Sequence, residues 1–215
     1  MSRRIAVIVI SLLAIAGFLA AAFFYKGNQA PPPQATEPVK ASSALVRFNA
    51  PSFGPAKAPV TIVEFFDPSC ESCRAFYPIV KQMMAKHPED VRLVLRYVRL
   101  HVGSEEAIRL LEAARKQGVY APVLEAVLES QPQWHDDATA AAAWQAAAGA
   151  GLDVDKAREQ MNSPDITATI QRDTEDAKSV GVKGTPTFFV NGKPLTSFGA
   201  QPLYDLIRSE IELSR

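Results

Sequence analysis

Residues 54–73, GPAKAPVTIVEFFDPSCESC, carry the strongest structural signal in this chain. Residues 60–66 are β-branched and aromatic on both faces, which is typical of a central strand covered on both sides. Pro68 and Ser69 end that strand, and the apolar spacing then predicts a helix over about 71–86. The stretch therefore predicts a buried strand, a tight turn, and a helix that begins at a pair of cysteines.

The segments on either side extend this into an α/β pattern. Residues 91–98 (VRLVLRYV) alternate in polarity and predict a second central strand, parallel to the first in a βαβ unit. Residues 45–48 predict a further short strand. The predicted helices of a long insertion over about 104–180 are 104–117, 120–129, 136–149, 153–162 and 164–180.

The end of the chain predicts a hairpin and a closing helix. Residues 187–190 (TFFV) predict a strand, Asn191-Gly192 a turn, and residues 194–196 a short partner strand. An amphipathic helix is expected over 201–213. The predicted order is βαβ, a helical insertion, and then ββα.

An apolar stretch, residues 5–25, lies near the amino terminus behind Arg3 and Arg4. A helix of this length spans roughly 30 Å, about one bilayer core, and the arginines favour export of the rest of the chain. We interpret residues 1–26 as a signal anchor. A signal peptide cleaved near residues 20–22 is the alternative, and a buried core helix is disfavoured.

Residues 27–43 are rich in proline, alanine, glutamine and serine and are interpreted as a semi-rigid linker. The predicted folded domain then covers residues 44–215. An exported domain would lie in the periplasm or at the outer face of the bacterial cytoplasmic membrane.

Composition narrows the function classes. The 23 lysines and arginines balance 23 aspartates and glutamates, which excludes a nucleic-acid binder driven by bulk positive charge. A hydrophobic content of 47% with 21% charged residues is typical of a globular protein. The chain has only two cysteines, so a framework of several disulfides is excluded.

Both cysteines lie in the motif Cys70-Glu71-Ser72-Cys73. One helical turn brings the two sulfurs to the same side, where they can form a disulfide or remain a dithiol. The positive end of the helix favours a thiolate at the first cysteine. We therefore expect Cys70 to be the nucleophile and Cys73 to resolve the mixed disulfide.

Two other uses of the cysteines are disfavoured. A zinc site normally takes four ligands, and the chain has no second cysteine pair, while His87, His101 and His135 are widely spaced. A purely structural disulfide would close too short a loop to add much stability. We predict no metal and no cofactor.

Glu64 is the one charged residue in the first predicted central strand, six residues before Cys70. Burial should raise the pKa of its carboxyl group, and such an acid can shuttle the proton of Cys73. The alternative is a structural ion pair with Arg96 or Arg99 on the next strand.

Four aromatic residues carry weaker expectations. Trp144 is expected in the core, whereas Trp134, which follows a proline-containing turn, is a candidate surface residue. Phe76 and Tyr77 either border a substrate groove or pack their helix, and packing is favoured.

Residues 53–213 resemble the DsbA-like branch of the thioredoxin superfamily. The resemblance is carried by GPAKAPVTIVEFFDPSCESC (54–73), VGVKGTPTFFVNGKPL (180–195) and the helical insertion between them. It implies a thioredoxin fold with a helical lid, with Cys70 as the exposed nucleophile, Cys73 as the resolving thiol and Glu64 as the buried acid. It also implies that Pro186 is cis and packs against the disulfide, and that Thr185 offers backbone groups to a bound peptide.

The dipeptide between the cysteines, Glu71-Ser72, departs from the Pro-His that strongly oxidising members typically have. Both residues are candidate substrate contacts. A negative Glu71 opposes the Cys70 thiolate, so we expect a redox potential nearer the reducing end of a range from about −120 to about −270 mV.

The first hypothesis is an exported thiol-disulfide oxidoreductase that acts on cysteine-containing exported proteins and exchanges electrons with a membrane redox partner. The alternative is a non-catalytic protein on the same fold that handles metal or holds unfolded chains. Isomerases of this kind usually dimerise through an added N-terminal domain. Only a linker precedes this fold, so we expect a monomer.

Overall fold

The computed structural model describes residues 44–215. The predicted signal or anchor helix and the predicted linker lie outside the described residues. Within residues 44–215, no helix has both the length and the apolar character needed to cross a membrane.

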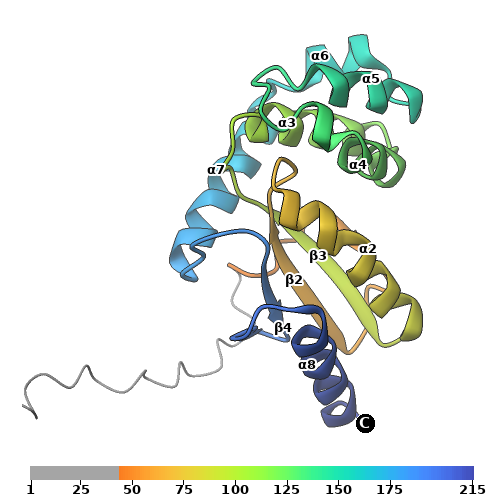
Figure 1. Cartoon of the computed structure of the whole chain (residues 1–215), viewed down its shortest axis with the longest axis vertical. Coiled ribbons are helices and arrows are strands. Elements are labelled where there is room, and N and C mark those ends of the chain that lie inside the picture. Colours follow the sequence, from red (N-terminus) through yellow and green to blue (C-terminus); the bar gives the residue numbers. More distant parts are fainter. Residues whose placement is uncertain (1–43) are drawn as a thin grey trace, which may run out of the picture. The chain divides into compact units, whose positions relative to one another are not determined.

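The sheet is built around the predicted buried strand. β2 (Val60–Phe66) lies in its middle, with β3 (Val91–Tyr97) parallel on one side and β4 (Thr187–Val190) antiparallel on the other. β1 (Ser52–Phe53) and β5 (Lys193–Pro194) form the edges. The predicted βαβ unit is confirmed, because α2 (Glu71–Lys86) connects β2 to β3 (Figure 1).

Helices cover both faces of this sheet. On one face Ile62 and Phe66 pack in the main core with residues of α2 and α8 (Ala200–Leu213). On the other face Val63 and Phe65 pack with Ala177 of α7 (Pro164–Ser179). Glu64 lies two residues from both Ile62 and Phe66, so its side chain is on the same face of the sheet as theirs, the face covered by α2.

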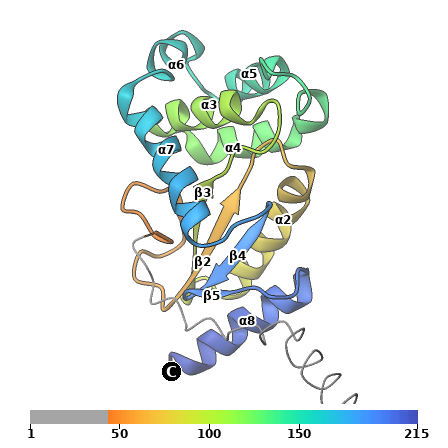
Figure 2. The same cartoon turned by 90° about the vertical axis from the view of Figure 1, so that its left-hand side faces the viewer.

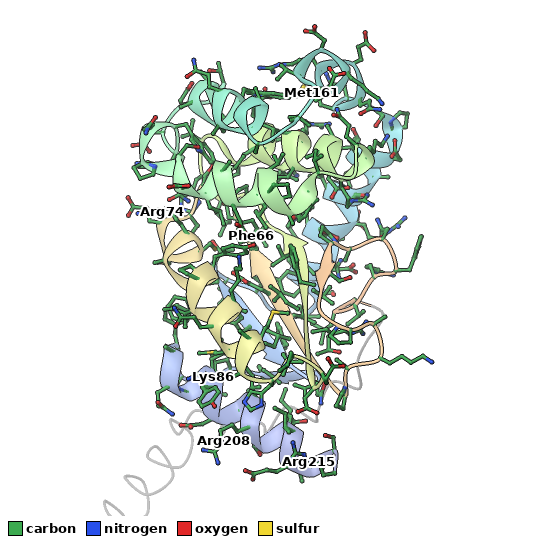
Figure 3. All side chains as sticks on the ribbon, turned by 90° about the vertical axis from the view of Figure 1, so that its right-hand side faces the viewer. Phe66, Arg74, Lys86, Met161, Arg208 and Arg215 are labelled. Atoms are coloured by element: carbon green, nitrogen blue, oxygen red, sulfur yellow. The ribbon has the colours of Figure 1, made fainter. Side chains whose placement is uncertain are left out.

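The helical insertion lies beyond the carboxyl ends of β2 and β3 (Figure 2). It consists of α3 (Ser104–Lys116), α4 (Tyr120–Glu129), a 3₁₀ turn η1 (Gln131–Gln133), α5 (Ala141–Gly149) and α6 (Val154–Gln160), and α7 leads back to the sheet. Figure 3 shows Phe66 and Arg74 at the end of the sheet next to this layer, and Lys86 at the opposite end. The cysteine pair, which lies between Phe66 and Arg74 in the sequence, is therefore near the insertion.

Two predicted elements are wrong. Residues 45–48 are turns rather than a strand, because the carbonyl oxygens of Ala44 and Leu45 accept hydrogen bonds from the Arg96 guanidinium at 2.6 and 2.9 Å. The helix predicted over 136–149 begins only at Ala141. Before it, the Asp137 carboxylate holds a turn by accepting the Ala141 N–H at 3.0 Å.

The aromatic residues give a mixed outcome. Trp144 is buried as expected, but the surface expectation for Trp134 is wrong. Its side chain is 1% exposed and its indole N–H donates to the Val127 carbonyl at 3.0 Å. Tyr77 is buried, and Phe76 packs on Phe188, so the packing interpretation is confirmed for both.

Candidate active site

A short turn after β2 places the cysteine pair. The carbonyl of Asp67 accepts the N–H of Cys70 at 3.0 Å, and the Asp67 carboxylate accepts the N–H of Ser69 at 2.9 Å. Cys70 is extended and lies immediately before α2, whose first turn contains Cys73. The Asp67 N–H points at the Cys73 sulfur, 3.5 Å away. The predicted arrangement of a strand, a tight turn and a helix that begins at the cysteines is confirmed.

The two thiols have opposite electrostatic environments. Cys73 is fully buried, and this burial raises its pKa far above the ordinary range. For Cys70, the hydrogen bond from the Cys73 thiol is the largest influence, and together with the other donors around it lowers the pKa to about 5 although burial opposes the shift. At neutral pH the pair therefore holds one thiolate and one thiol.

Cys70 is more covered than the resemblance implied. Only 6% of its surface is exposed, so it is not an open nucleophile, although Cys73 is wholly covered. One neighbour is the Thr185 carbonyl, which accepts a hydrogen bond from the Cys70 thiol at 3.3 Å. Another is Gln131 of η1, whose side-chain amide donates to the Cys70 carbonyl at 2.9 Å.

The loop before β4 contributes the opposite wall of the site. The Thr185–Pro186 peptide bond is cis, as the resemblance implied, and Pro186 is buried. The Thr185 hydroxyl oxygen is buried and has no hydrogen-bond partner. It is therefore free to donate to a thiolate at Cys70, and such a hydrogen bond lowers the pKa of that thiol.

Glu64 is fully buried, and neither of its carboxyl oxygens has a hydrogen-bond partner. The alternative ion pairs are excluded: Arg96 binds Asp173 at 2.7 Å on the other face of the sheet, and Arg99 binds Glu105 at 2.6 Å. Burial raises the pKa of Glu64 to about 8, and the nearby Cys70 charge adds to the shift. The predicted rise in its pKa is confirmed.

Glu71 and Ser72 lie on the exposed side of the first turn of α2. The Glu71 side chain is 71% exposed, and its carboxylate lies 4.0 Å from the His135 ring. Solvent screening therefore reduces the repulsion that Glu71 exerts on a thiolate at Cys70.

Three residues that the sequence reasoning did not single out organise the site. Asp67 holds the turn, and its carboxylate also accepts a hydrogen bond from His101 Nδ1 at 2.8 Å. Gln131 donates to the Pro68 and Cys70 carbonyls at 2.7 and 2.9 Å and so ties the insertion to the turn. Asp67 had a signal, since a carboxylate directly after a buried strand often caps a turn. Gln131 and His101 had none, because they are distant in sequence.

Among residues 44–215, no cluster of histidine, cysteine, aspartate and glutamate side chains could hold a metal ion. The chemistry available at this site is that of the two thiols, the buried carboxyl group and the polar groups of the Thr185 loop.

Comparison with known proteins agrees with this geometry. The family model described as thioredoxin matches residues 49–206. The chain belongs to the thioredoxin family. A solved relative within this family is a thioredoxin-like oxidoreductase from Silicibacter pomeroyi DSS-3. It is 31% identical, has a TM-score of 0.70, and the alignment covers 81% of this chain and 97% of that one.

Two curated relatives differ in how much of their length is matched. The thiol:disulfide interchange protein DsbA of Bordetella parapertussis is 27% identical over 86% of this thioredoxin-family chain and 85% of its own length. The Na(+)/H(+) antiporter NhaA of Herminiimonas arsenicoxydans is 32% identical over 66% of this chain, but only 22% of the antiporter is covered. The chain therefore spans about a fifth of that antiporter's length. The predicted resemblance to DsbA-like oxidoreductases is confirmed. The predicted enzyme class, a thiol-disulfide oxidoreductase, agrees with the name of the DsbA relative.

Proposed function

We propose that this protein is an exported thiol-disulfide oxidoreductase that exchanges disulfides with protein cysteines through Cys70 and Cys73. The observation that carries the proposal is the placement of the two cysteines: Cys70 lies before α2 beside the Thr185 carbonyl, and Cys73 is buried in the first turn of the helix. This placement lowers the pKa of Cys70 to about 5 and raises that of Cys73 beyond the ordinary range. A thiolate is both the nucleophile and the better leaving group in disulfide exchange. The pair is thus suited to react with partners at Cys70 alone.

In the oxidising direction, a substrate thiolate attacks the Cys70 sulfur of the Cys70–Cys73 disulfide. The bond between Cys70 and Cys73 breaks, a mixed disulfide forms at Cys70, and Cys73 leaves with the electron pair. The Glu64 carboxyl group, with its pKa of about 8, supplies the proton that Cys73 then takes up. A second substrate thiolate attacks the substrate sulfur of the mixed disulfide and releases Cys70 as a thiolate. The substrate loses two electrons and the cysteine pair gains them.

In the reducing direction the same steps run backwards. The Cys70 thiolate attacks a substrate disulfide and forms a mixed disulfide, and the leaving substrate sulfur takes a proton. Glu64 as a carboxylate then accepts the Cys73 proton, so that Cys73 can attack Cys70 and release the second substrate thiol. Glu64 serves both directions because its raised pKa lies close to neutral pH.

Thr185 and Pro186 would form the docking edge for the substrate. The Thr185 carbonyl oxygen lies 3.3 Å from the Cys70 sulfur, so an extended peptide that pairs with this backbone would bring its own sulfur to Cys70. Such pairing reads backbone groups, which suits a range of unrelated cysteine-containing proteins. Glu71 and Ser72, exposed beside Cys70, would contact the same substrates.

The proposed cellular setting rests on the amino-terminal sequence. Residues 1–26 would hold the protein as a signal anchor at the outer face of the membrane, and 27–43 would link the anchor to the catalytic domain, residues 44–215. Such an anchor would keep the cysteine pair within reach of a membrane redox partner that restores its redox state. The proposed catalytic unit is a monomer.

The deciding experiment is the redox equilibrium of the full chain against a glutathione series, read by thiol alkylation and mass. We expect one reversible two-electron couple, absent from Cys70→Ala and Cys73→Ala. A potential above about −200 mV assigns the protein as a disulfide donor, and one near −250 mV or lower assigns it as a reductase. Absence of any couple would overturn the proposal, and holding activity retained by Cys70→Ala would then favour the non-catalytic binding protein.

A further inference from the structure

His101 lies in the loop between β3 and α3 and reaches the turn that carries the cysteines. Its Nδ1 is 2.8 Å from the carboxylate of Asp67. Because a carboxylate only accepts hydrogen bonds, Nδ1 carries the proton and donates it. The other nitrogen is free to take up a proton from solvent, since the side chain is 43% exposed. The ring is therefore fixed in place and yet able to become a cation.

Asp67 connects this ring to both cysteines. The same carboxylate oxygen that binds His101 also accepts the Ser104 hydroxyl at 2.8 Å and the Leu100 N–H at 2.9 Å. The backbone of Asp67 bonds Cys70 and points at the Cys73 sulfur. The position of the His101 ring relative to the dithiol is thus set by hydrogen bonds rather than by a mobile side chain.

The charges that face His101 come from several elements. Burial lowers the pKa of the ring, but the hydrogen bond to Asp67 and the charges of Asp67, Cys70 and Asp136 outweigh it, so the pKa is raised. On its open side the ring lines a groove of about 510 Å³ that also contains Arg99, Glu105 and Lys178. Arg99 and Glu105 bind each other at 2.6 Å, which offsets both charges.

His101 is one of two cationic side chains near Cys70. The other is Arg74 of α2, whose guanidinium donates to the Gln131 side chain at 2.9 Å, and its charge does not change with pH in the range tested. Glu64 and Cys73 are neutral when protonated, and Glu71 is negative and exposed. His135 lies on the Glu71 side, 3.3 Å from Asp136 and 4.0 Å from Glu71. Asp67, although negative, is already bound by four donors: His101, Ser104 and the backbone N–H groups of Leu100 and Ser69.

We propose that His101, held by Asp67, is a positioning residue whose imidazolium stabilises the Cys70 thiolate and makes the cysteine pair more oxidising at acidic and neutral pH. The inference rests on the proposed exchange at Cys70 and adds the residue that tunes it. A cation beside a thiolate stabilises the reduced pair, and a more stable reduced form means a more oxidising disulfide. The effect fades as pH rises through the pKa of the ring.

The test uses the full chain with His101→Gln, which keeps an N–H for Asp67 and removes the charge, and His101→Lys, which retains a charge at high pH. His87→Gln is the matched control, because His87 ends α2 at the far end of the helix from the cysteines. The Cys70 pKa is read from thiolate absorbance, and the potential from glutathione equilibria at pH 6 and pH 9.

We expect His101→Gln to raise the Cys70 pKa by about 0.5 unit, since a partly exposed cation is screened. At pH 6 its equilibrium constant with glutathione should shift about threefold toward the protein disulfide, or about 14 mV. At pH 9 it should match the wild type. His101→Lys should preserve the low Cys70 pKa and carry the oxidising character to pH 9, and His87→Gln should change neither.

An unchanged Cys70 pKa in His101→Gln would overturn the inference, as would a shift of equal size at pH 6 and pH 9, which would indicate a structural role. A wild-type chain with no reversible couple would overturn the proposed function instead. The two failures are therefore distinguishable.

Discussion

Glu64 on β2 lies in register with Leu95 on β3, so its buried carboxyl group has an apolar neighbour where a basic side chain could have neutralised it. On the other side β4 places Phe188 opposite the same residue. Neither carboxyl oxygen has a hydrogen-bond partner. A buried acid without a partner costs stability, and it keeps its proton near neutral pH, which suits proton exchange with Cys73.

Glu64→Gln should slow the step in which Cys73 gains or loses its proton. We expect release of glutathione from a Cys70 mixed disulfide, which requires a Cys73 thiolate, to fall at least about tenfold at pH 7. The wild-type rate should rise with pH toward a plateau near the Glu64 pKa of about 8. Acid quenching and mass measurement follow the release. The control is Glu89→Gln, which changes an exposed carboxylate before β3 and should leave the rate of glutathione release unchanged.

Glu64→Leu should make the protein more stable, with a gain that grows with pH. The pKa of Glu64 is raised in the folded state, so between its ordinary value of 4.5 and about 8 the folded protein retains a proton that the unfolded chain loses. Wild-type stability therefore falls with rising pH across this window. The difference in the free energy of unfolding between Glu64→Leu and the wild type should reach about 3 to 5 kcal/mol near pH 8, measured by urea unfolding of the oxidised forms. A constant gap between pH 5 and pH 8 would contradict the assignment.

Thr185→Val should weaken the nucleophile. The buried Thr185 hydroxyl has no other partner and can donate to the Cys70 thiolate. Its loss should raise the Cys70 pKa by about one unit, the scale of one hydrogen bond to a charged group. Thiolate absorbance measures the shift. In the control Thr187→Val the lost hydroxyl was bound to the Gly184 carbonyl at 2.7 Å, and Cys70 should be unaffected.

Glu71→Gln tests the expectation that this dipeptide lowers the redox potential. Removing a negative charge beside Cys70 favours the thiolate, so the potential should rise. Because the Glu71 side chain is 71% exposed, we expect the equilibrium constant with glutathione to change by less than about threefold. A fall in potential, or a rise of more than tenfold, would show that its influence has been misjudged.

Arg96→Met should destabilise the domain without changing the cysteine chemistry. Arg96 is fully buried and binds Asp173 at 2.7 Å and Asp176 at 2.6 Å, so its loss leaves buried carboxylates without their partner. We expect a loss of about 3 to 5 kcal/mol in the free energy of unfolding.

Arg99→Met is the matched control for this ion pair. It breaks the half-exposed bridge to Glu105 and should cost less than about 1 kcal/mol. Equal losses in the two variants would contradict the assignment of Arg96 as a buried anchor.

The order of the elements from β2 onward, and the identity of the reacting cysteine pair, could be predicted from local sequence patterns. The run over 60–66 has apolar residues on both faces and is short and rich in β-branched and aromatic residues, which favours a central strand over a buried helix. Cys70 and Cys73 are one helical turn apart, so local geometry alone brings their sulfurs together. The turn at Asn191-Gly192 was equally local, and it is observed between β4 and β5.

Most of the groups that surround this cysteine pair are known only from the folded structure. Gln131 and His101 come from two distant segments, and no spacing in the sequence relates them to Cys70. Thr185 was brought to the site only by the family resemblance. The same limit explains why residues 45–48 were misjudged, since their carbonyls are held by the side chain of Arg96 from another strand. Periodicity records which face of an element is buried, whereas hydrogen bonds between distant segments depend on how the faces meet.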